Sequence, residues 1–280
     1  MLDPFPAGSV DPQVLNRGLM KLTGERPIEG KTPDSLLALH AAGYREVRDR
    51  LEPAGTFLDL GCGLGDGTAS FADGERVLVG IDYDIDTAVL ASTDKADVGL
   101  MTACSDGSSL CIADDSFDYV CSSHLIEHFV DPSFHAREVS RVLAADGTAF
   151  FITPNKPADF ENPYHVYLFE RDDLAEMLGR YFDDVEVLGL DATPMVKADF
   201  EKRRNLAKKL LKLDPLGLRH KLPRNWFVAL HAAGRRVAYR FLDDEQGSGN
   251  SGITDAEFFT TEAIDDSTLC LLAVVRKPSI

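Results

Sequence analysis

Residues 57–68 constrain the fold more than any other part of this chain. They read Phe-Leu-Asp-Leu-Gly-Cys-Gly-Leu-Gly-Asp-Gly-Thr, an apolar run that ends in an acid and opens into alternating glycines. A buried strand that turns sharply into a helix has this pattern, because glycine accepts tight backbone angles and lets a ligand press against bare backbone. Open α/β sheets bind ligands in crevices at the carboxyl ends of such strands. The segment therefore predicts a ligand-binding loop in an α/β sheet.

Charge around this loop indicates the class of ligand. The dinucleotide fingerprint requires glycine at its first, third and sixth positions, but the sixth position counted from Gly61 is Asp66. Asp59 and Asp66 flank the loop, and a pyrophosphate prefers a helix N-terminus without negative groups. The same carboxylates suit a ligand that carries an ammonium and a sulfonium, such as S-adenosylmethionine. A strand-turn-helix without a cofactor is the alternative, although four alternating glycines weaken packing without another use.

A second acid supports a nucleoside ligand. Asp82 ends the short apolar strand at 76–81, twenty-one positions after Gly61. In nucleoside-binding sheets an acid at about this spacing accepts the ribose hydroxyls. Taken alone, Asp82 could instead cap the helix that follows it.

Several segments together carry a family resemblance. Motif-like stretches lie at 58–65, 80–82, 105–107, 116–132 and 142–155. The set resembles the class I S-adenosylmethionine-dependent methyltransferases, of the kind that includes the quinone O-methyltransferases and many glycan-cluster methyltransferases. The resemblance covers roughly residues 20–190 and resumes at the final strand. It does not fix the methyl acceptor.

The resemblance implies a Rossmann-like α/β fold with a seven-stranded, mostly parallel sheet, a reversed last strand at its edge and helices on both faces. Hydrophobic patterns place strands at 56–60, 76–81, 98–103, 117–122, 148–153, 184–190 and 269–275, and helices at 33–52, 65–73, 84–92, 132–144 and 171–181. The expected cofactor-binding residues are Asp59, Gly61, Cys62, Gly63, Gly65, Asp82, Tyr83, Asp106, Gly107, Ser123 and His124. Asp106 would accept the adenine amine, or it could simply be a turn residue in Ser-Asp-Gly.

We expect the chain to consist of four parts. Residues 1–54 form a leader and helix over the cofactor site, and 55–191 form the methyltransferase core. Residues 192–257 form a basic helical insertion with a flexible loop, and 258–280 form the C-terminal edge strand. In the leader, residues 23–27 resemble glycan-cluster relatives, so that Tyr44 or Arg45 could touch the ligand or the helix could merely brace the sheet.

Composition limits the environment and the partners. The five cysteines form no C-x-x-C pair, which indicates reduced thiols and a cytoplasmic location. No apolar run reaches the roughly 18 residues of a membrane span. A net charge of -17 argues against nucleic-acid binding, which needs a basic footprint.

The segment from His124 to His128 reads H-x-x-E-H, a zinc-hydrolase pattern. That chemistry needs both histidines on a long helix, whereas this segment follows a strand and is cut off by Asp131-Pro132. We therefore expect no metal here. His124 is expected near the methionine part of the cofactor, and His128 either acts in catalysis or supports the site.

His165 follows the fifth strand in the sequence Asn-Pro-Tyr-His-Val-Tyr. Related enzymes that methylate hydroxyls often carry a histidine here, and a neutral imidazole suits proton removal. His165 is therefore the expected general base, and the alternative is a loop histidine that caps the next helix.

The segment 197–240 is rich in Lys and Arg and contains an amphipathic stretch at 206–213. It could contact an anionic membrane surface peripherally, cover the active site, or be a solvated cap paired with the acidic body. The sequence predicts O-methylation of a small or lipid-linked acceptor such as a sugar. Methylation of a quinone-type or isoprenoid ring and a non-catalytic cofactor-binding subunit remain the alternatives.

Overall fold

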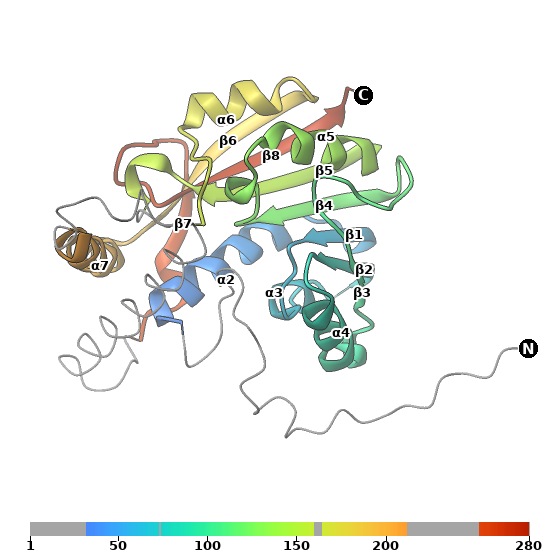
Figure 1. Ribbon diagram of the computed structural model, residues 1–280, viewed down its shortest axis with the longest axis horizontal. Helices are drawn as coiled ribbons and strands as arrows, with labels where there is room; N and C mark the ends of the chain where they lie inside the picture. The colour runs from blue at the N-terminus through green and yellow to red at the C-terminus, as the bar shows by residue number, and fades with distance from the viewer. Residues whose placement is uncertain (1–31, 73, 160–163, 212–251, 280) are drawn as a thin grey trace, which may run out of the picture.

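The computed structural model describes residues 32–72, 74–159, 164–211 and 252–279. One eight-stranded sheet runs through this part of the chain, in the order β3-β2-β1-β4-β5-β8-β6-β7 (Figure 1). Its strands are β1 (Ala54–Leu60), β2 (Glu75–Asp82), β3 (Met101–Cys104), β4 (Phe117–Ser123), β5 (Leu143–Pro154), β6 (Phe182–Ala192), β7 (Phe258–Thr261) and β8 (Cys270–Pro278). The sheet confirms the predicted α/β class.

Strands β1 to β5 run parallel, so their carboxyl ends meet at one edge. The β8 strand is antiparallel to both β5 and β6, which confirms the predicted reversal. Its predicted place at the sheet edge was wrong, because β8 lies between β5 and β6. Six consecutive buried residues, from Cys270 to Val275, explain this interior position. The expected count of seven strands also fell short, since the short β7 pairs with the outer side of β6.

Helices cover both faces of the sheet (Figure 1). The helices α2 (Asp34–Arg48), α3 (Asp66–Ala69), α4 (Ile85–Asp94) and α7 (Pro194–Leu211) lie on one face, and α5 (Pro132–Val142) and α6 (Arg171–Leu178) lie on the other. Successive residues of a strand point to opposite faces of the sheet, so their side chains pack into two separate hydrophobic cores. Phe150 of β5 packs in the first core and its neighbour Phe151 packs in the second.

Capping residues fix the N-termini of the helices that lie next to the site. Asp131 caps α5 by accepting a hydrogen bond from Ser133 N, and Asp84 caps α4. The alternative that Asp82 caps α4 was therefore wrong. Phe134 of α5 is 55% exposed. The helix α2 begins after Pro33 without a side-chain cap.

The basic insertion lies only partly within the described chain. In α7, Lys197 pairs with Asp191 at 2.6 Å and Arg203 pairs with Asp199 at 2.9 Å. The first pair joins α7 to β6, whereas the second lies within α7. The leader at 23–27, most of the segment 197–240 and the loop at 243–252 lie outside the described residues. The predicted division into four parts therefore stays a prediction.

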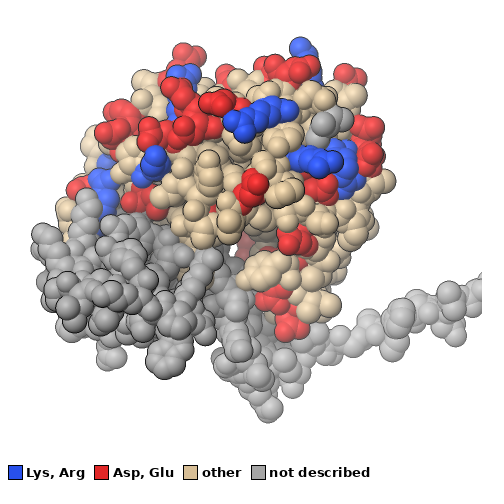
Figure 2. Space-filling view, turned by 45° about the horizontal axis from the view of Figure 1, so that its top comes forward, with Lys and Arg blue, Asp and Glu red and all other residues tan. Residues whose placement is uncertain are grey.

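All five cysteines are free thiols. None of the helices in the described ranges is long and apolar enough to cross a membrane. On the face shown in Figure 2, Lys and Arg stand among Asp and Glu and form no continuous basic surface.

Candidate active site

The loop after β1 exposes bare backbone at the carboxyl edge of the sheet. Gly61, Gly63 and Gly65 adopt positive φ angles of 78°, 55° and 79°, which L side chains rarely take up. Two amides of the loop, those of Gly61 and Cys62, donate to Ile81 O and so join the loop to β2. A Cβ built on Gly63 would meet no atom within 4 Å. Gly63 thus presents open backbone, as a loop that receives a ligand requires.

Asp59 anchors this loop from below. It is completely buried, and its carboxyl group accepts hydrogen bonds from Thr68 Oγ1 at 2.5 Å and from Tyr44 Oη at 3.0 Å. Burial raises the pKa of Asp59 to about 7, although both hydroxyl donors act against that rise. Tyr44 thus joins α2 to β1, and its contact with the ligand stays a prediction. Arg45 points elsewhere and bonds to Asp255.

Asp82 lies at the end of β2 and faces the loop. Its Oδ2 accepts from Gly63 N at 3.2 Å, and its Oδ1 accepts from Asp84 N at 2.9 Å. Tyr83, beside it, is 60% exposed. An acid held against an open glycine backbone, next to an exposed aromatic ring, fits a nucleoside better than a diphosphate. The residues present therefore fit S-adenosylmethionine.

The turn after β3 brings Asp106 and Gly107 to the same edge. Asp106 accepts from the amide and hydroxyl of Ser108, and these two hydrogen bonds lower its pKa. Gly107 O accepts from Nδ1–H of the buried His135. The sequence interpretation missed His135, whose Nε2 meets Ser122 Oγ at 2.8 Å and so ties β4 to this turn. Its only signal was a polar residue on the apolar face of α5.

The end of β4 carries Ser123 and His124. His124 adopts a positive φ of 51°, which points to a constrained backbone at the site. Its ring lies 4.2 Å from the ring of His40, a residue of α2. Ser123 Oγ and His124 Nε2 are buried without a hydrogen-bond partner. Such orphaned polar atoms are expected where a bound molecule supplies the partner.

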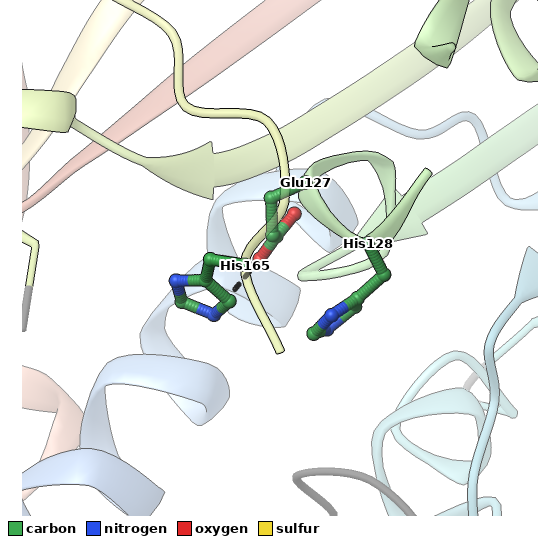
Figure 3. Close-up of side chains that lie close together, drawn as sticks. All are labelled: Glu127, His128 and His165. Carbon is green, nitrogen blue, oxygen red and sulfur yellow. Dashed lines mark ion pairs between the residues drawn. The ribbon is translucent and has the colours of Figure 1, made fainter. Parts of the chain in front are cut away.

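Glu127 is the centre of a group of histidines (Figure 3). It lies in the single 3-10 turn η2 (Ile126–His128), so the long helix of a zinc hydrolase is absent from this described segment. Its Oε1 is 3.6 Å from His124 Nδ1 and 4.0 Å from His165 Nε2. Burial by itself would raise the pKa of Glu127, but the neighbouring histidines outweigh burial and lower it.

His165 is held by an acid that the sequence did not single out. Its Nδ1 lies 2.9 Å from Asp159 Oδ1, and both side chains are almost fully buried. Asp159 follows the 3-10 turn η3 (Lys156–Ala158), and its Oδ2 is buried without a partner. The backbone of Val166 donates to Glu127 O, which fixes the two segments together. His128 and His165, predicted separately, therefore lie together, with ring centroids 5.3 Å apart.

One group in the described chain could hold a metal ion. The ligand atoms of Glu127, His128 and His165 all lie within 4.8 Å of one another. Glu127 and His128 belong to η2, and His165 lies on the neighbouring segment (Figure 3).

Comparisons with known proteins agree with this geometry. The methyltransferase domain family matches residues 58–151. A relative from Mycolicibacterium smegmatis, named as a probable S-adenosylmethionine-dependent methyltransferase, is 29% identical over 60% of this chain and 67% of its own. A demethylmenaquinone methyltransferase of Corynebacterium urealyticum is 33% identical over 44% of this chain and 54% of its own. The ubiquinone biosynthesis O-methyltransferase of Parvibaculum lavamentivorans is 29% identical, over 40% of its length.

Solved structures share the fold. An S-adenosylmethionine-dependent methyltransferase of Thermotoga maritima matches with a TM-score of 0.53 and 12% identity, over 85% of this chain and 91% of its own. The cyclase SpnF matches with a TM-score of 0.54 and 19% identity, over 84% and 80% of the two chains. At these identities the structures support the fold alone. Together with the glycine loop and Asp82, the matching domain family identifies residues 58–151 as a class I S-adenosylmethionine-dependent methyltransferase domain.

Proposed function

We propose that the chain transfers the methyl group of S-adenosylmethionine to a hydroxyl group of a small or lipid-linked acceptor such as a sugar. The observation that carries this proposal is the pair formed by Asp159 and His165, 2.9 Å apart. It follows β5 in sequence and adjoins Glu127 and the end of β4, where the cofactor residues Ser123 and His124 lie. A histidine oriented by an acid is suited to taking the proton of a hydroxyl group.

The chemistry follows from the orientation of the ring. Asp159 Oδ1 accepts from His165 Nδ1, so the neutral imidazole carries its lone pair on Nε2. The acceptor hydroxyl gives its proton to Nε2 while its oxygen bonds to the methyl carbon. S-adenosylmethionine, when bound, would supply the activated methyl group and keep the electron pair of its carbon–sulfur bond. The cofactor supplies an already activated methyl group, so this chain contributes mainly position and orientation.

The acceptor is proposed to bind between η3, α7 and the segment that precedes β8. A cleft of about 270 Å³ there is bordered by Ala158, the residue before Asp159. Its lining is mixed, with the polar Lys197, Glu201, Arg204 and Ser267 and the apolar Ala198, Phe200 and Leu269. Polar groups of both signs suit sugar hydroxyls better than an isoprenoid ring.

Methylation of a quinone-type ring is the second candidate. The observation that favours it is the identity to the demethylmenaquinone and ubiquinone-pathway methyltransferases. These matches cover 54% and 40% of those proteins.

Methyl transfer from labelled cofactor to a panel of sugars, acidic sugars and quinols tests both candidates. Transfer to a sugar hydroxyl supports the proposal, and transfer only to quinols favours the second candidate. His165→Gln should lower kcat by a factor of about 10² to 10⁴. Binding of S-adenosylhomocysteine should be unchanged in this variant, and Glu176→Gln on the exposed face of α6 serves as the control. Cofactor binding without transfer to any acceptor would indicate the non-catalytic subunit.

A further inference from the structure

We propose that Glu127, His128 and His165 form a binding site for a divalent transition metal of the zinc class. The three residues come from two chain segments that the backbone fastens together, since Val166 N and Tyr167 N both donate to Glu127 O. Their ligand atoms already lie within 4.8 Å of one another. Metal–ligand bonds of about 2.0 to 2.2 Å would require these atoms to close by only about 1 Å.

The hydrogen bonds behind the two imidazoles match those of metal-bound histidines. A histidine ligand almost always donates its other ring N–H to a carbonyl or a carboxylate. His128 Nδ1 donates to Tyr164 O at 2.9 Å, and His165 Nδ1 donates to Asp159 Oδ1 at 2.9 Å. Both bonds fix the tautomer with the lone pair on Nε2. In His165 that nitrogen is directed at Glu127 Oε1.

The third ligand is a buried carboxylate that needs a cation. Glu127 has no solvent exposure, and its Oε2 accepts from Thr153 Oγ1 at 3.1 Å. Its Oε1 is buried without a hydrogen-bond partner, because His124 and His165 lie at 3.6 Å and 4.0 Å, beyond hydrogen-bond reach. Leaving a buried carboxylate oxygen unpaired is costly. A metal ion bound to Oε1 would remove that cost.

The ligand types select the metal. Two imidazoles and one carboxylate suit zinc, cobalt, nickel or iron, whereas magnesium and calcium prefer oxygen ligands. Three protein ligands leave a coordination position for water or another small ligand. The site is thus specific for transition metals and differs from a magnesium site.

Occupancy would have a regulatory consequence, and this step rests on the proposed function. The metal would use His165 Nε2, the atom that the proposed mechanism assigns to the acceptor proton. His165 Nε2 therefore cannot bind the metal ion and take up the acceptor proton at the same time. We expect zinc to inhibit methyl transfer without preventing cofactor binding.

Cobalt titration of the full chain, first stripped with EDTA, tests the site independently of activity. Cys104→Ser and Cys111→Ser are introduced first, because these two exposed thiols could bind cobalt by themselves. We expect one cobalt per chain with a visible absorption band, no binding of magnesium, and a fall in affinity of at least tenfold in Glu127→Gln, His128→Gln and His165→Gln. Asp159→Asn should weaken binding by about 10- to 100-fold with all three ligands intact.

Glu176→Gln, on the exposed face of α6 and outside the three ligands, serves as the control and should keep its cobalt affinity. Calorimetry with S-adenosylhomocysteine verifies that each variant is folded. No cobalt binding in the parent protein, or equal binding in all three ligand variants, would overturn the inference. If zinc binds but methyl transfer continues, the site stands and the assignment of His165 as the base in the proposed function fails.

Discussion

Replacing Asp59 with Asn tests whether folding keeps a carboxyl group protonated beneath the glycine loop. The group has an ordinary pKa of 3.8, and burial raises it to about 7 in the folded chain. Between these values the unfolded chain has released a proton that the folded chain still holds, so stability falls as pH rises. Above pH 7 both states are ionised and the loss stays constant. A rise of about 3 pKa units corresponds to about 4 kcal/mol in total.

The assay is urea unfolding of the wild type and Asp59→Asn at pH 5, 6, 7 and 8. The amide oxygen of Asn can still accept from Thr68 and Tyr44, so the variant should fold. Relative to the variant, the wild type should lose about 2.5 kcal/mol of unfolding free energy between pH 5 and pH 8. Asp183→Asn, an exposed acid on β6, should follow the wild type. Parallel pH profiles for the wild type and Asp59→Asn would refute the reasoning.

Three further substitutions probe the site. Gly80→Ala should destabilise the chain by about 1 to 3 kcal/mol in thermal unfolding, because its Cβ would lie 2.7 Å from Cys62 Sγ. Adding Cys62→Ala should restore most of the lost stability, and no restoration would contradict the packing argument. Gly63→Ala should weaken binding of S-adenosylhomocysteine at least tenfold in calorimetry. It should cost only about 1 kcal/mol of stability, since the new methyl group projects into open space. Unchanged affinity would place the ligand elsewhere. Burial lowers the pKa of His135 to about 4, so the unfolded state takes up a proton first and the stability falls as pH drops from 6.5 towards 4. In urea unfolding, His135→Gln should show a smaller loss of stability over this pH range, and an equally steep loss would contradict the argument.

The sequence predicted the half of the sheet that binds the cofactor because its signals are local. The strand β1, its glycines and Asp82 lie within a short stretch, and each carries a backbone or charge pattern of its own. The position of β8 depends on a contact that local pattern does not encode. An apolar strand of nine residues fits an edge or an interior position equally well until its two neighbours are known.

The catalytic side shows the same limit. His128 and His165 could be selected by residue type, but their meeting around Glu127 depends on two loops that lie far apart in sequence. Asp159 gave no signal at all, since an acid after a short turn is common on protein surfaces. Only the folded arrangement shows that it lies 2.9 Å from His165.

The acids near the glycine loop also act differently from what charge alone predicts. Asp66 lies 2.5 Å from Lys95 Nζ, and that ion pair neutralises it. Asp59 turns inward to two hydroxyl donors, and its raised pKa leaves it partly protonated at neutral pH. The negative charge that would favour a sulfonium over a diphosphate is therefore expected from the carboxylate at the end of β2 and the one that follows β3. Asp82 is held there against the open backbone of the loop, and the lowered pKa of Asp106 keeps its carboxylate ionised.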